Sequence, residues 1–160
     1  MSEITLRRFT PEDTNWLVRQ HGEHYAHAEG FDDSFGILVR EILEAFVAAH
    51  DPERERGWIA VQAGQRLGSI FCVAAGDSTA KLRLFLLTPA ARGRGLGKRM
   101  LRTCMDFARS AGYADMKLWT HESHRAACAL YAATGWTLVD SRPVHSFGVD
   151  LVEQTWTIRL

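Results

Sequence analysis

The sequence is poor in cysteine and proline, with three cysteines and four prolines among 160 residues. Cys72, Cys104 and Cys128 lie far apart along the chain, a spacing that argues against a disulfide framework and against a zinc site. Isolated cysteines of this kind are typical of small buried side chains in a reducing compartment. We therefore expect a cytoplasmic protein without structural disulfides.

The sequence also lacks net charge and long apolar runs. Nineteen Lys and Arg balance nineteen Asp and Glu, so no overall basic field attracts nucleic acid or anionic lipid. No apolar run approaches the roughly 20 residues that a membrane helix needs, and residues 1–10 contain no signal-peptide core. We expect one soluble domain over residues 1–160, with no nucleic-acid partner and no membrane contact.

Two stretches of the chain lack charge of one sign. Residues 20–39 contain no Lys or Arg, but hold Glu23, Glu29, Asp32 and Asp33. Residues 78–105 contain no acidic residue, but hold seven cations: Lys81, Arg83, Arg92, Arg94, Lys98, Arg99 and Arg102. The first stretch favours a cation and the second an anion, although chance and solvated helix faces would give the same pattern.

Hydrophobic periodicity alternates between strand and helix along the chain. The pattern predicts a mixed α/β (α+β) fold, in which a sheet carries helices on its faces. In the helix expected at 33–50, one side carries Phe35, Leu38, Ile42, Ala45 and Phe46. The expected order is strand (4–8), two helices (from 11, and 33–50), three strands (58–61, 67–73, 80–87), a helix that stops at 112, strand (116–120), helix (123–134) and two strands (136–140, 152–160).

A glycine-rich turn follows the third of those central strands. Residues 84–102 read LFLLTPAARGRGLGKRMLR, so an apolar strand leads through a glycine-rich turn into a helix. Glycines bring backbone N–H groups close to one ligand, and the first turn of a helix has unpaired N–H groups that suit an anion. Lys98 and Arg99 oppose the helix dipole there, a placement that makes sense with a bound polyanion such as a diphosphate.

Two common phosphate loops do not fit this turn. A Walker loop needs G-x-x-x-x-G-K-[ST], but Arg92 occupies the first glycine position and Arg99 follows Lys98. A dinucleotide fingerprint needs G-x-G-x-x-G, and the interval between Gly95 and Gly97 is too short.

The segment Arg92-Gly93-Arg94-Gly95-Leu96-Gly97 resembles the [Q/R]-x-x-G-x-[G/A] motif of the GNAT (Gcn5-related) N-acetyltransferases, which holds the pyrophosphate of acetyl-coenzyme A. The expected order of elements is also similar to that family across nearly the whole chain. The resemblance implies a central mixed seven-stranded sheet flanked by about four helices. It also implies acetyl-CoA as co-substrate and requires no metal.

Other segments resemble the acetyltransferase half of proteins that carry a MarR-type DNA-binding domain. These segments are AKLRLFLL, KLWTHES, LYAATGW and HSFGVDLVEQTW. The first strand is expected at residues 4–8, so we expect no DNA-binding half here.

The resemblance also assigns residues to the cofactor. The backbone of Phe85, Leu86 and Leu87 would meet the acetyl and pantetheine part, where one N–H acts as oxyanion donor. His124 stands where many members have an asparagine that contacts the cofactor. The pyrophosphate would meet Arg92, Gly93, Arg94, Gly95, Leu96, Gly97 and Lys98.

Tyr131 is the expected general acid. It lies in LYAATGW, which looks like the family's LY-x-x-x-GF helix end with Trp136 at the phenylalanine position. The family places this hydroxyl near the cofactor sulfur, where a phenol can protonate the departing thiolate. From helical spacing alone, Tyr131 reads as a core aromatic.

The general base is less well defined. Some members use a carboxylate on the fourth or fifth strand, but those strands hold Lys81, Arg83, Lys117, Trp119 and Thr120. The remaining candidates for the base are Glu23 and His24 on the first helix, and His121 and Glu122 after the fifth strand. Of these we name Glu23 as the general base. The histidine spacings at 21, 24 and 27 and at 121 and 124 contain no H-E-x-x-H, so we expect no metal.

The leading hypothesis is transfer of acetyl to a primary amine of a small molecule, by direct attack in a ternary complex. Alternatives are a protein or peptide N-acetyltransferase, and a non-catalytic acetyl-CoA sensor. Edge strands of such sheets often pair, which leaves a homodimer open. By family architecture, acids and aromatics at 16–35 and 143–148 would bind a cationic amine: Glu23, Tyr25, Glu29, Phe31, Asp32, Asp33, Phe35, His145, Ser146 and Phe147.

Overall fold

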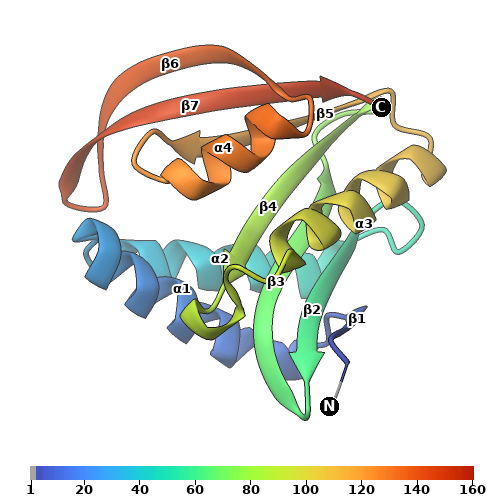
Figure 1. Ribbon diagram of the computed structural model, residues 1–160, viewed down its shortest axis with the longest axis horizontal. Helices are drawn as coiled ribbons and strands as arrows, with labels where there is room; N and C mark the ends of the chain where they lie inside the picture. Colours follow the sequence, from blue (N-terminus) through green and yellow to red (C-terminus); the bar gives the residue numbers. More distant parts are fainter. Residues whose placement is uncertain (1–2) are drawn as a thin grey trace. The chain divides into compact units, whose positions relative to one another are not determined.

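The computed structural model describes residues 3–160 (Figure 1). Within that range the expected order of helices and strands is confirmed. The elements are β1 (Thr5–Arg8), a 3-10 turn (Pro11–Asp13), α1 (Thr14–Glu29), α2 (Ser34–Ala49), β2 (Arg56–Gln62), β3 (Gln65–Ala74), β4 (Thr79–Leu87), a second 3-10 turn (Pro89–Ala91), α3 (Leu96–Ser110), β5 (Asp115–His121), α4 (Arg125–Ala133), β6 (Thr137–Ser146) and β7 (Val149–Arg159).

The seven strands of the described chain form one sheet in the order β1-β2-β3-β4-β5-β7-β6. Strands β1 to β4 pair antiparallel, whereas β4 and β5 pair parallel. The sheet is therefore mixed, as expected. None of the helices within residues 3–160 has both the length and the apolar character that a membrane crossing requires.

The chain divides into two compact units, and each unit is made of segments that are distant in the sequence. The first contains residues up to Phe9, 51–118 and 157–160, and the second contains residues 10–50 and 119–156. A single domain over residues 1–160 therefore stays a prediction.

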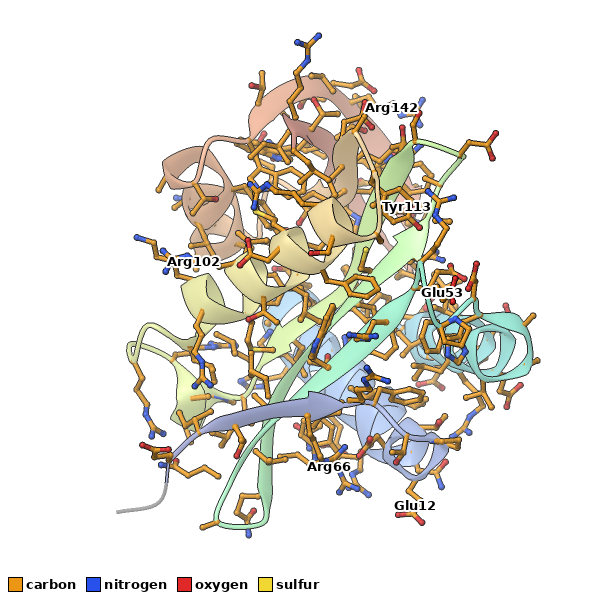
Figure 2. All side chains as sticks on the ribbon, turned by 90° about the vertical axis from the view of Figure 1, so that its right-hand side faces the viewer. Glu12, Glu53, Arg66, Arg102, Tyr113 and Arg142 are labelled. Atoms are coloured by element: carbon orange, nitrogen blue, oxygen red, sulfur yellow. The ribbon has the colours of Figure 1, made fainter. Side chains whose placement is uncertain are left out.

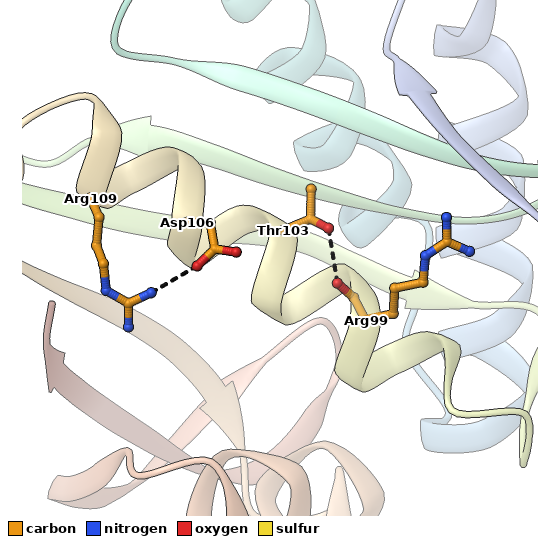
Figure 3. A network of polar contacts seen from close by, with 4 residues as sticks. All are labelled: Arg99, Thr103, Asp106 and Arg109. Atoms are coloured by element: carbon orange, nitrogen blue, oxygen red, sulfur yellow. Dashed lines mark hydrogen bonds and ion pairs between the residues drawn. The ribbon is translucent and has the colours of Figure 1, made fainter.

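The core of the first unit lies between α3 and the strands. Ile59, Ile70 and Phe71 are buried on β2 and β3. Helix α3 buries Met100, Leu101, Cys104, Met105 and Ala108 at helical spacing. Its other side is polar: Thr103 Oγ1 donates to the Arg99 carbonyl at 3.0 Å, and Arg109 pairs with Asp106 at 2.9 Å (Figure 3). The strong amphipathicity of α3 explains why the sequence predicted it well.

In the second unit, the buried stripe of α2 is rotated from the predicted one. Phe46 is buried as predicted, and Phe35 and Ile42 are half-buried. Val39 and Leu43 are also buried, whereas Leu38 is 38% exposed and Ala45 is exposed. The segment SFGILVREILEAFVAA is apolar nearly all round, so periodicity alone left the angular position of the buried stripe undetermined.

Strands β6 and β7 form a hairpin, seen as the long curved pair in Figure 1. The turn consists of Phe147 and Gly148, with φ of +55° and +79°. In the two-residue hairpin turn whose backbone twist matches that of the strands, both turn residues have positive φ. Residues 143–146 therefore belong to β6, and the connection between the last two strands, which the expected strands at 136–140 and 152–160 left longer, is two residues long.

A bulge interrupts β4 where it pairs with β3. Ser69 pairs with Leu86 and Phe71 with Arg83, so Leu84 and Phe85 both lie opposite Ile70. Leu84 has φ of +50°, and Ser69 Oγ donates to its carbonyl at 2.6 Å. The extra residue bends β4 and changes which way its following side chains and N–H groups face.

Gly68 is required beside the bulge, since a Cβ there would clash with the Leu86 carbonyl oxygen. We expect Gly68→Ala to lower the free energy of unfolding by about 1–3 kcal/mol, the usual cost of overpacking. Gly36→Ala on α2 is the control: it meets no atom within 4 Å, and should raise stability by about 0.5–1 kcal/mol. Urea unfolding measures both, and an undiminished stability in Gly68→Ala would contradict the role of this glycine.

Candidate active site

The glycine-rich turn of the first unit ends in the start of α3. Gly93 and Gly95 have φ of +74° and +73°, and Gly95 is the N-cap residue of the helix. The Arg99 N–H donates to the Gly95 carbonyl at 3.2 Å. The N–H groups of Leu96, Gly97 and Lys98 precede that bond and have no partner within the helix. The turn therefore supplies converging N–H donors and the positive end of the α3 dipole.

Exposed cations surround these donors. Arg92, Arg94 and Lys98 are exposed on the turn and the first helical turn. Arg94 is held toward β2, where its Nη2 donates to Gln62 Oε1 at 2.9 Å. Arg99 donates to the Ile4 carbonyl at 2.8 Å. With no carboxylate between residues 78 and 105, the turn suits a polyanion.

The parallel pairing of β4 with β5 lies at the start of β4. The pairs are Thr79 with Asp115, Ala80 with Met116 and Lys81 with Lys117. Phe85, Leu86 and Leu87, which the resemblance assigns to the acetyl and pantetheine part, lie at the other end of the strand. That assignment stays a prediction.

Tyr113 belongs to the first unit and lies just after the end of α3 (Figure 2). Its hydroxyl donates to the Arg54 carbonyl at 2.8 Å, and the Arg54 guanidinium lies 4.3 Å from the ring centroid. Tyr113 is thus a structural tyrosine, held by its hydroxyl group.

In the second unit, Tyr131 lies near the end of α4 and is 3% exposed. Its ring packs against Trp136 and Trp156, with centroids 5.7 and 6.1 Å away. Both tryptophans are buried, and Gln154 Oε1 accepts from Trp156 Nε1 at 3.0 Å. The aromatic surroundings hold the phenol in a fixed place, and its acid role stays a prediction.

Another cluster of the second unit joins α1, the α1–α2 connection, the end of β5 and the β6–β7 turn. Tyr25 stacks on Phe31 at 5.6 Å, and Phe31 contacts Phe147 at 4.9 Å, between ring centroids. Phe35 lies 5.0 Å from both Tyr25 and Phe147. The Asp32 N–H donates to the Phe147 carbonyl at 2.8 Å, which ties the turn to this cluster. Four predicted acceptor-side aromatics therefore come together.

Two histidines complete that cluster. His121 lies 5.8 Å from Phe31, and His124 lies 4.8 Å from Tyr25, measured between ring centroids. Glu29 Oε1 lies 3.8 Å from His124 Nε2. No pattern in the sequence places either histidine beside these aromatics, although the H-x-x-H spacing itself can be read from it.

Of the other predicted acceptor acids, Asp32 lies at this cluster, with its N–H on the Phe147 carbonyl and its carboxylate beside Gly148. The remaining ones are not gathered there. Glu23 is exposed and stands two positions from Tyr25, which places it on the opposite side of α1. Asp32 Oδ1 accepts from the Ser34 N–H and hydroxyl, so its carboxylate is engaged at the start of α2. Asp33 is exposed, and His145 pairs with Asp150 at 2.8 Å. The base role of Glu23 stays a prediction.

Burial makes three histidines of the second unit weak bases. It lowers the pKa of His21 and of His124 to about 4, and it also lowers the pKa of His121. Neighbouring His121 lowers the pKa of His124 further, whereas Glu29 opposes the shift. The imidazoles are therefore neutral near pH 7. Over residues 3–160, no group of three His, Cys, Asp or Glu side chains is placed to hold a metal.

The family model of the acetyltransferase (GNAT) family matches residues 14–136. The chain belongs to this family, which classes it with the acyltransferases that use acetyl-CoA. The resemblance that the glycine turn suggested is thereby confirmed.

Curated relatives agree with that assignment. Mycothiol acetyltransferase of Mycolicibacterium vanbaalenii is 33% identical over 129 residues, which cover 81% of this chain and 39% of that protein. N-acetyltransferase 8F1 of Rattus norvegicus is 29% identical over 114 residues, which cover 68% of this chain and 50% of that protein. The chain thus spans half or less of the length of these relatives.

Solved structures share the fold. An acetyltransferase of Salmonella typhimurium, solved with its cofactor acetyl-CoA, is 20% identical with a TM-score of 0.78, covering 99% of this chain and 95% of that one. The ribosomal-protein-S18-alanine N-acetyltransferase of Escherichia coli is 19% identical with a TM-score of 0.74, covering 98% and 94%. At these identities the likeness shows the fold alone.

The buried His21 predicts an acid-sensitive fold. The native state keeps this imidazole neutral down to about pH 4, whereas the unfolded chain takes up the proton near pH 6.5. Stability should therefore fall as the pH drops from about 6.5 to 4, and His121 and His124 add to the loss with the same sign. Urea unfolding of His21→Leu at pH 7 and pH 4.5 should show a smaller fall than wild type. The exposed His27→Gln is the control, and an equal fall in all three proteins would exclude His21 as a cause.

Proposed function

We propose that this chain transfers the acetyl group of acetyl-CoA to a primary amine of a small molecule, by direct attack in a ternary complex. The observation that carries the proposal is the glycine turn at the start of α3, whose N–H donors and exposed cations suit a pyrophosphate. Family membership supports it. The similarity to the mycothiol acetyltransferase of Mycolicibacterium vanbaalenii favours a small-molecule acceptor.

The chemistry forms a nitrogen–carbon bond and breaks the carbon–sulfur bond of the thioester. The amine loses one proton and the thiolate gains one. We assign the backbone of Phe85, Leu86 and Leu87 to the carbonyl, because a backbone N–H that points at this oxygen can stabilise developing negative charge. We assign the Tyr131 hydroxyl to the proton that the departing thiolate takes up. Residues from Arg92 to Lys98 hold the pyrophosphate.

Two alternatives to this proposal are a protein or peptide N-acetyltransferase and a sensor without turnover. The cations Lys81, Arg83 and Lys117 stand on β4 and β5, where some family members have a catalytic carboxylate, which favours a sensor that binds acetyl-CoA without turnover. Mass spectrometry of the protein with acetyl-CoA and a panel of amines, amino acids and peptides separates the three. An acetylated small amine supports the proposal, and an acetylated peptide alone contradicts it.

The role of Tyr131 has its own test. We expect Tyr131→Phe to lower kcat by about 10²-fold or more, the usual worth of a general acid, with an unchanged Kd for acetyl-CoA. Tyr113→Phe is the control, because it removes a hydroxyl bound only to the Arg54 carbonyl. It should cost about 1 kcal/mol of stability and leave kcat unchanged. A Tyr131→Phe variant with wild-type kcat would contradict the acid role.

The role of the glycine turn in binding acetyl-CoA can be tested by a substitution that strains its backbone. Gly95→Ala places a side chain at a φ of +73°, which costs about 1–2 kcal/mol, and should weaken acetyl-CoA binding at least several-fold by shifting the N–H donors. Gly64→Ala carries the same strain at φ +77° in the β2–β3 turn, with no atom within 4 Å of the new Cβ. Calorimetric titration with acetyl-CoA should find wild-type affinity in Gly64→Ala. Equal affinities in the two variants would exclude the turn as the binding site.

A further inference from the structure

Gln154 is a buried polar side chain that is hydrogen-bonded to one of the rings around Tyr131. It lies on β7, two positions before Trp156, and is 7% exposed. Its Oε1 accepts the indole N–H of Trp156 at 3.0 Å and the thiol of Cys128 at 3.4 Å. Because an indole N–H can only donate, the amide oxygen, and not the amide nitrogen, faces Trp156. The orientation of this amide is therefore fixed by its neighbours.

The two hydrogen bonds of Gln154 lead to Tyr131 by different routes. Cys128 lies three positions before Tyr131 on α4, whereas Trp156 packs its ring against the Tyr131 ring with centroids 6.1 Å apart. A thiol is a weak donor, so the bond from the indole N–H is the stronger of the two. The Trp156 ring is thus the contact through which Gln154 can act on Tyr131.

The two tryptophans that pack on Tyr131 are held differently. Trp136 and Trp156 are both buried, but Nε1 of Trp136 has no hydrogen-bond partner among the described residues. The torsion that rotates an indole ring about its bond to Cβ is broad, whereas a hydrogen bond to Nε1 selects one orientation. Of these two rings, Trp156 is therefore the one that a hydrogen bond orients.

We propose that Gln154 is a positioning residue for the Tyr131 hydroxyl, because it fixes the Trp156 ring on which the Tyr131 ring packs. The proposal rests on the proposed function, in which that hydroxyl protonates the departing thiolate. Gln154 acts here through Trp156 and Tyr131, and its role involves no contact with the cofactor or the amine. Misplacing a reacting group by roughly 1 Å can cost about 10²-fold in rate, so loss of this hydrogen bond should lower kcat.

The hydrogen bond can be removed from either end. Gln154→Leu removes the amide oxygen, and Trp156→Phe removes the indole N–H but keeps an aromatic ring. Each should lower kcat about tenfold and leave the KM for acetyl-CoA unchanged, measured as coenzyme A release with the amine that the mass-spectrometry panel identifies. In the double variant the second substitution should add little, because the bond is already gone. Two tenfold losses that multiply, or a wild-type kcat in both single variants, would overturn the proposal.

Cys128→Ala is the matched control, because it removes the other hydrogen bond to the same oxygen and keeps the bond from Trp156. Its kcat should equal that of wild type, and a loss as large as that of Gln154→Leu would exclude the Trp156 bond as the cause. Should Gln154→Leu not fold, Trp156→Phe alone decides, and a wild-type kcat there would overturn the proposal.

A merely structural role of Gln154 is separated by combining Gln154→Leu with Tyr131→Phe. Without the hydroxyl there is no acid to position, so this double variant should have the kcat of Tyr131→Phe. A further tenfold loss would show that Gln154 supports the fold in general, and would overturn its assignment to Tyr131.

Nuclear magnetic resonance tests the positioning without acetyl transfer. The ring signals of Tyr131 should shift in Gln154→Leu, because the neighbouring indole is no longer held in one orientation, and should stay in place in Cys128→Ala. Unchanged Tyr131 signals in a folded Gln154→Leu variant would overturn the proposal.

The two proposals fail separately. Shifted Tyr131 signals in Gln154→Leu, together with no acetylated amine in the panel or a wild-type kcat in Tyr131→Phe, would contradict the proposed function or its acid and leave the positioning of the Tyr131 ring standing. A low kcat in Tyr131→Phe, together with a wild-type kcat in both Gln154→Leu and Trp156→Phe, would overturn the positioning role alone.

Discussion

The bulge in β4 is the constraint on which the first unit depends. Two residues of β4 lie opposite one of β3, Ser69 ties the Leu84 carbonyl, and Gly68 leaves room for the Leu86 backbone. The parallel pairing of β4 with β5 lies before the bulge, at Thr79, Ala80 and Lys81. The bent strand leads, through Pro89–Ala91, into the glycine turn and α3. The direction in which the chain enters the glycine turn thus depends on one local irregularity.

The distribution of charge follows these elements. The first unit carries a run of cations on and around the start of α3, with α3 buried along its apolar side and polar along the other. The second unit contains the acid-rich α1–α2 segment, where Glu29 lies beside a neutral His124 whose ring packs on Tyr25. A formal net charge of zero hides this separation. One region suits a polyanion and the other a cation, the two charge types that acetyl-CoA and an amine bring.

Several features could be predicted because they depend on neighbours in sequence. Helix α3 has a strict apolar stripe and a glycine at its start, so its limits and buried side follow from spacing. Because α2 carries apolar residues on nearly every side, its sequence did not show which side is buried. In the structure the buried residues are Val39, Leu43 and Phe46. The length of β6 was underestimated because it is exposed along most of its length, so no alternation of buried and exposed side chains marks it. The bulge has no marker in the sequence, since Leu84 is not a residue that favours positive φ.

The sequence by itself determined the order of helices and strands, the glycine turn and the family, because these depend on local periodicity, glycine placement and a short motif. Only the tertiary structure decided which acids and histidines meet. Glu29 and His124 are 95 positions apart in the chain, and Glu23 and Tyr25 are neighbours that point opposite ways on one helix. Which of these side chains come together depends on how α1, β5, α4 and the β6–β7 turn pack. That packing is set by burial of side chains distant in sequence, and no local pattern records it.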